Sequence, residues 1–114
     1  MGAINRLVAG PGLPSPETLA FMEAVTGQVR PRTDASPLFS DEALRRLSMP
    51  VLLLGGERDA VRDCHAIAAR LQRLVPRFES QLLPDAGHVL LGAAPQIAPF
   101  LERLDDAATA SGRP

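Results

Sequence analysis

The stretch "MPVLLLGGERDAV" (49–61) decides the fold of this chain. Its first part is an unbroken apolar run that Pro50 opens and two glycines close. A short apolar run between such residues is typical of a strand that is buried on both faces, as the strands of parallel sheets are. The sequence therefore predicts a buried strand over 51–54, with helices covering the sheet to which it belongs.

The residues after this strand predict a helix and then a second strand. Apolar side chains recur at helical spacing from Cys64 to Leu74, and Pro76 ends the pattern. "RFESQLLP" (77–84) then alternates in part between apolar and polar residues, which indicates a strand over 78–83 near a sheet edge. Parallel pairing of the two strands across the helix would form a right-handed βαβ unit.

Further helices are expected on both sides of this unit. Ser15 as N-cap and Pro16 as first helical residue predict an amphipathic helix over about 16–29, and Ser40 predicts a short helix over about 41–47. The residues from Ala107 onward are expected to be disordered. A C-terminal helix is predicted from apolar residues at helical spacing, namely Leu90 or Leu91, Ile97, Phe100, Leu101 and Leu104.

The composition excludes several classes of function. The 114 residues suffice for one small domain, and a net charge of −1 gives no basis for binding nucleic acid or an anionic membrane. All twelve basic residues are arginines, so no lysine is present for Schiff-base chemistry. The single cysteine, Cys64, permits no internal disulfide and no cysteine-based zinc site. We expect a cytoplasmic protein without metal or cofactor.

Two polar residues follow the two predicted strands. Asp59 comes after the first strand, and His88 comes after the second. Because the carboxyl ends of parallel strands meet at one edge of a sheet, both loops are expected to open on the same edge. A carboxylate there can accept one ring N–H of an imidazole and leave the other nitrogen free to act as a base.

Structural roles compete with this interpretation. Asp59 could cap the following helix, although Asp63 lies better placed for that role and remains an alternative acid. His88 could be an incidental loop histidine. We expect His65 to lie on the surface and Cys64 to be a small buried apolar residue. Solvated loop charges are expected at Glu57 and Asp85.

Together, "MPVLLLGGERDAV" and "LPDAGHVLL" (83–91) resemble the C-terminal portion of the α/β-hydrolase superfamily. Its members carry a proline, an apolar strand and Gly-x-x-Asp, then a helix, then a strand that ends in Gly-His. The resemblance covers about residues 40–104. It implies a partial α/β-hydrolase fold, in which a parallel βαβα unit holds the last two strands and the C-terminal helix of the core, over 40–106. Residues 1–39 would be a remnant of the helical cap and its connection, and 107–114 a disordered tail.

The resemblance also implies roles for two residues. Asp59 matches the acid of the catalytic triad, and His88 matches the histidine that takes the proton of the nucleophile. The family carries its nucleophile on an upstream G-x-S-x-G, and no serine of this chain lies in that context. We therefore expect no nucleophile in this chain.

The expected function is that of a C-terminal fragment of a serine-type hydrolase that acts on esters or related carbonyl substrates. Alone, the chain is expected to be inactive, and a small-molecule substrate would bind only if the missing N-terminal half completed the site. The alternative is a non-catalytic α/β-hydrolase-like module that associates through its open sheet edge. We further expect the isolated chain to be marginally stable and oligomeric or aggregation-prone, with self-association through the exposed strand edge and without nucleic-acid or membrane partners.

Overall fold

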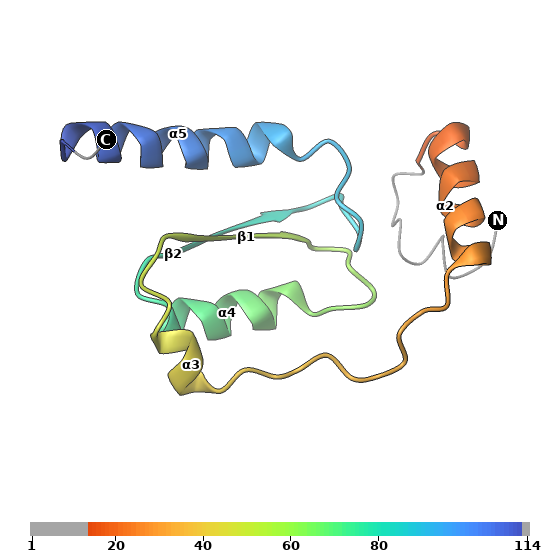
Figure 1. Cartoon of the computed structure of the whole chain (residues 1–114), viewed down its shortest axis with the longest axis horizontal. Helices are drawn as coiled ribbons and strands as arrows, with labels where there is room; N and C mark the ends of the chain where they lie inside the picture. The colour runs from red at the N-terminus through yellow and green to blue at the C-terminus, as the bar shows by residue number, and fades with distance from the viewer. Residues whose placement is uncertain (1–13, 113–114) are drawn as a thin grey trace.

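The centre of the fold is a parallel βαβ unit, seen in a computed structural model that describes residues 14–112 (Figure 1). Strand β1 (Val51–Gly56) leads through helix α4 (Cys64–Leu74) into strand β2 (Phe78–Leu83). The two strands pair in parallel and form the sheet of the described residues. These three elements are the ones that the sequence predicts, and the mixed α/β arrangement with a parallel strand pair is confirmed.

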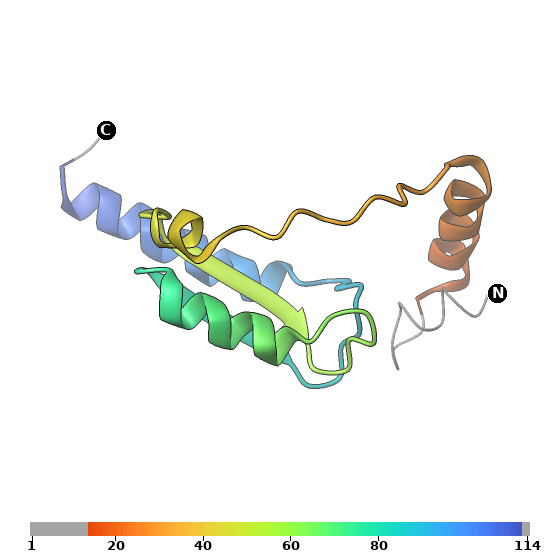
Figure 2. The same ribbon diagram turned by 90° about the horizontal axis from the view of Figure 1, so that it is seen from below.

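The register of the sheet brings both strand ends to the same level. Val51 lies opposite Phe78 at one end, and Gly56 lies opposite Leu83 at the other. The loops that follow β1 and β2 therefore leave the same edge of the sheet. Helix α4 lies on one face of the strands and helix α5 (Ala94–Ala110) on the other, as Figures 1 and 2 both show.

Strand β1 is less buried than its apolar sequence predicts. Its leucines are half-buried, and only the two glycines at its end, Gly55 and Gly56, are fully buried. Among the described residues, β1 has a strand partner on one edge only, and α4 contacts the strands whereas α5 contacts them little. The expectation of a strand buried on both faces is therefore corrected, because one edge and one face of β1 are incompletely covered within residues 14–112.

The N-terminal helices have the predicted caps but unequal surroundings. Helix α2 (Pro16–Gln28) is capped by Ser15, whose hydroxyl accepts from the Thr18 N–H, and helix α3 (Asp41–Arg45) is capped in the same way by Ser40. Helix α3 lies close to α4, whereas α2 stands apart at the far end of an extended segment (Figures 1 and 2). No residue of α2 is buried, so the predicted amphipathic helix forms without covering a core. Residues 1–13 of the expected cap remnant lie outside the described residues.

The C-terminal helix differs from its prediction at both ends. It begins at Ala94 rather than near Leu90, because Gly92 adopts a positive φ of 70° that interrupts a helix. It continues to Ala110, so the disordered tail expected from Ala107 is wrong for 107–110. Alanine is the best helix former, and the Thr109 hydroxyl donates to the Asp105 carbonyl within the last turns. Residues 113–114 of that tail lie outside the described residues.

Ion pairs connect helices α5 and α3 to the βαβ unit. On α5, the Arg103 guanidinium lies 2.6 Å from the Glu79 carboxylate of β2. On α4, Arg70 donates to the Phe39 carbonyl at 2.7 Å and to the Asp41 carboxylate at 2.8 Å, which holds the start of α3. Within residues 14–112, none of the helices is both long and apolar enough to cross a bilayer.

Candidate active site

Asp59 and His88 meet at the shared end of the two strands. Asp59 lies three residues after the end of β1, and His88 lies five residues after the end of β2. The His88 Nδ1 atom lies 2.9 Å from the Asp59 Oδ2 atom, a normal distance for a charge-assisted hydrogen bond. The structure therefore brings together the two residues that the sequence placed at one edge of the sheet.

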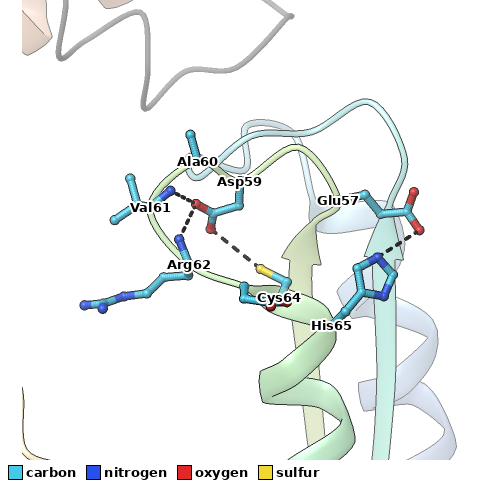
Figure 3. A pocket seen from close by; sticks show the side chains of 8 residues that line it. Glu57, Asp59, Ala60, Val61, Arg62, Cys64 and His65 are labelled. Carbon is cyan, nitrogen blue, oxygen red and sulfur yellow. Dashed lines mark hydrogen bonds and ion pairs between the residues drawn. The ribbon is translucent and has the colours of Figure 1, made fainter.

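A tight turn after β1 orients the Asp59 carboxylate. Its Oδ1 atom accepts from the backbone N–H groups of Val61 at 2.7 Å and Arg62 at 2.9 Å (Figure 3). An aspartate that binds the amides two and three residues ahead forms its own local turn. Its side chain is only 5 % exposed. These bonds lie before α4, so Asp59 holds the loop and does not cap the helix.

These contacts keep the Asp59 carboxyl ionised. Burial is the largest influence and raises its pKa, but the hydrogen bonds from His88 and from the Arg62 and Val61 amides together outweigh it and lower the pKa from 3.8 to about 2. An ionised carboxylate accepts hydrogen bonds and donates none. The hydrogen shared with His88 therefore belongs to the imidazole, which carries it on Nδ1.

This tautomer defines what His88 can do. With the proton on Nδ1 facing Asp59, the Nε2 atom of the neutral ring keeps its lone pair and can accept a proton. The His88 side chain is 39 % exposed, so the ring is within reach of a molecule outside the loop. The arrangement can take up one proton at Nε2, while the carboxylate stabilises the imidazolium that forms.

Asp63 and Cys64 occupy neighbouring positions with different partners. The Asp63 carboxylate accepts from the Ala66 N–H at 2.9 Å and is the N-cap of α4, as one of its two sequence interpretations predicted. The Cys64 thiol is buried, and its Sγ lies 3.6 Å from Asp59 Oδ2, to which it donates (Figure 3). Burial raises the pKa of the Cys64 thiol, and the Asp59 carboxylate raises it further.

A hollow of about 390 Å³ adjoins the Asp59 turn, between the 57–63 loop and the start of α4. At its rim, the exposed imidazole of His65 lies 3.8 Å from the Glu57 carboxylate (Figure 3). Asp85 also faces a cation, because the Arg58 guanidinium lies 3.7 Å from it.

Within the described part of the chain, no group of three or more histidine, cysteine, aspartate or glutamate side chains could hold a metal ion.

Several serine hydroxyls serve the local backbone. Those of Ser15 and Ser40 cap helices, and that of Ser111 donates to the Ala107 carbonyl at 2.7 Å. Each of these hydroxyls lies at the end of its own helix.

The local partners of Asp59 were not predicted from the sequence. Cys64 is buried as expected of an apolar residue, but its thiol is also a donor to the carboxylate. The amides of Val61 and Arg62 are further donors that the sequence-based expectations did not include. Their signal was present in the sequence, since an aspartate followed by a short loop and a separate helix cap at Asp63 is typical of an aspartate-centred turn.

Comparison with known proteins finds two carboxylesterases of Bacillus subtilis (strain 168). The chain is 41% identical over 61 residues to a protein described as uncharacterized carboxylesterase nap, which covers 53% of this chain and 20% of that protein. It is 32% identical over 63 residues to carboxylesterase YbfK, covering 54% of this chain and 21% of that protein. The chain thus spans about a fifth of the length of these relatives. No protein-family model matches the chain, and no solved structure matches it significantly.

Proposed function

We propose that this chain supplies the acid and the histidine of a serine-type esterase of the α/β-hydrolase class. The observation that carries the proposal is the hydrogen bond between Asp59 and His88, formed from two loops at the shared end of parallel strands. The similarity to two carboxylesterases supports the same class. The substrate class is an ester or a related carbonyl compound.

The proposed chemistry assigns one step to each residue. His88 Nε2 takes the proton of an attacking hydroxyl and later gives a proton to the leaving alcohol. Asp59 stays ionised, fixes the imidazole tautomer and stabilises the imidazolium. A hydroxyl nucleophile and the N–H donors that stabilise the tetrahedral oxyanion must come from outside the Asp59–His88 pair.

The first test asks whether the chain hydrolyses an activated ester alone. Purified 1–114 should release no p-nitrophenol from p-nitrophenyl acetate above the buffer rate, because the pair lacks a nucleophile and an oxyanion hole. A rate that vanishes in the His88→Ala variant of the isolated chain would contradict this expectation.

The decisive test is complementation. The chain is co-expressed with a carboxylesterase segment that contains G-x-S-x-G and lacks the region matching this chain. Ester hydrolysis should appear in the mixture and fall at least a hundredfold with His88→Ala or Asp59→Ala. His65→Ala is the matched control, since it removes the other histidine without touching the pair, and it should leave the restored rate unchanged.

The open edge of β1 favours a second candidate, a non-catalytic module that pairs with another copy. An edge strand without a partner offers unpaired backbone groups to a second chain. Sedimentation equilibrium should then show a concentration-dependent dimer that Asp59→Ala and His88→Ala leave intact. A monomer at all concentrations up to the millimolar range would remove this candidate.

A further inference from the structure

The turn that carries His88 lies with its backbone directly against the end of β1. Gly56 is buried there, and a Cβ atom at this position would lie 2.2 Å from the Ala86 carbonyl oxygen and 2.3 Å from that of Gly87. We propose that Gly56 is a positioning residue: by carrying no side chain it lets the turn over 84–87 pack on β1, and this packing sets His88 beside Asp59.

Backbone hydrogen bonds connect the two loops on either side of this contact. The Glu57 N–H donates to the Leu83 carbonyl at 3.0 Å, and the Arg58 N–H donates to the Ala86 carbonyl at 3.0 Å. The second bond lies one residue before Asp59 and two residues before His88 in their respective loops. The two loops are therefore joined through their backbones, and this connection does not depend on the side chains of the pair.

The His88 side chain has little other support. Its ring is 39 % exposed, so close packing does not fix it from all sides. A half-exposed ring keeps a 2.9 Å contact with Asp59 only if its own backbone is placed correctly. The backbone contact at Gly56 is the feature that supplies this placement.

Two other glycines provide a comparison. A Cβ atom at Gly55 would lie 2.8 Å from Cys64 Sγ, 3.0 Å from Cys64 Cβ and 3.2 Å from Leu82 Cδ2, all of which are side-chain atoms. A Cβ atom at Gly56 meets backbone atoms, which move only with the whole turn. At Gly27 on α2, nothing lies within 4 Å of such an atom.

The role of His88 as a base rests on the proposed function, whereas the role of Gly56 in positioning His88 does not. The two tests measure that positioning and use no substrate. If the complementation experiment failed, the tests below would still decide whether Gly56 positions His88.

The first experiment records the His88 ring signals by NMR in the full chain at one fixed pH, with the His65 signals as internal reference. Gly56→Ala should shift the His88 ring signals in the same direction as Asp59→Asn, because the turn over 84–87 can no longer pack on β1 and the ring loses its contact with the carboxylate. Gly27→Ala should leave the His88 signals unchanged, and Gly55→Ala should shift them less than Gly56→Ala. A folded Gly56→Ala variant with unchanged His88 signals would overturn the proposal.

The second experiment does not require Gly56→Ala to fold. Amide hydrogen exchange is measured in Asp59→Asn and His88→Ala, which remove the pair and keep Gly56. If the backbone contact positions the pair, the Glu57 and Arg58 amides keep at least a third of their wild-type protection. Loss of that protection in both variants would show that the pair holds the loops together instead, and the proposal would be wrong.

Discussion

The Asp59 carboxylate is held by four hydrogen bonds. Its two carboxylate oxygens accept from two backbone amides, from the Cys64 thiol and from His88. The amides fix the carboxylate from the loop side, so Oδ2 points to the histidine without further adjustment. For the proposed function, a preset carboxylate of this kind would hold the imidazole in one orientation without a cost of reorientation during reaction.

The depressed pKa of Asp59 predicts a specific acid sensitivity. A carboxyl with a folded-state pKa of about 2 and an unfolded value near 3.8 stabilises the folded chain fully above about pH 5, and this contribution is lost progressively as the pH falls from there through 2. Urea unfolding between pH 6 and pH 2 should therefore show a smaller loss of stability in Asp59→Asn than in wild type. Asp105→Asn, on the exposed side of α5, should retain the wild-type slope.

The Cys64 thiol is expected to react slowly with thiol reagents. Its side chain is buried, and burial together with the Asp59 carboxylate raises its pKa, so little reactive thiolate forms at neutral pH. Reaction with Ellman's reagent should be at least tenfold slower in the folded chain than in urea. Asp59→Asn should speed the reaction in the folded state. Equal rates in the folded and unfolded chain would count against the buried position.

Helix caps should matter only where the capped helix packs against something. Asp63→Ala removes the cap of α4, which covers the sheet, and should cost about 1 kcal/mol of stability in urea unfolding. Asp63→Ser should restore most of it. Ser15→Ala removes the cap of α2, which buries no residue, and should leave the unfolding midpoint unchanged. A similar loss in both alanine variants would mean that α2 belongs to the cooperative unit.

The sequence predicted the βαβ unit well because its boundaries are set locally. Pro50 and the glycines bracket β1, Asp63 begins α4, and Pro76 follows its end. The meeting of Asp59 and His88 was also predictable, since the carboxyl ends of neighbouring parallel strands share one edge.

Other features depend on contacts that no local pattern encodes. The apolar residues of α2 indicate a helix but not whether a partner covers it, and Phe21 remains 69% exposed. The half-burial of β1 reflects how little of its edge and face is covered within residues 14–112, which its own composition does not encode. The hydrogen bond from the Cys64 thiol to Asp59 depends on the position of the first residue of α4 relative to the Asp59 turn. The tertiary arrangement sets that position.

At the scale of the whole molecule, the chain is expanded and poor in core. Its radius of gyration is 17.2 Å, against about 13 Å for a compact chain of this length. The buried apolar side chains of the described residues are those of Cys64, Leu74 and Val75. Large apolar side chains elsewhere are exposed, including Leu38 at 87% and Phe39 at 61%.

Removal of the N-terminal region should cost little stability. A variant that begins at Leu38 loses α2 but keeps the Arg70 contacts to Phe39 and Asp41, so its free energy of unfolding should stay within about 0.5 kcal/mol of the full chain. Arg70→Ala in the full chain is the contrasting variant and should destabilise it measurably. A truncated chain that loses more stability than Arg70→Ala would contradict this view of α2.

The Asp59–His88 bond joins residues that are 29 positions apart in the chain. A contact of that separation closes only after the intervening strand, helix and strand have come together, because the loop between its ends must first be ordered. During refolding from urea, the His88 ring signal should therefore reach its native position last, after the helical signal of α4 has recovered. The His88 ring signal would then report when the last step of folding is complete. This readout needs no substrate, so it would apply to the chain whether or not it takes part in catalysis.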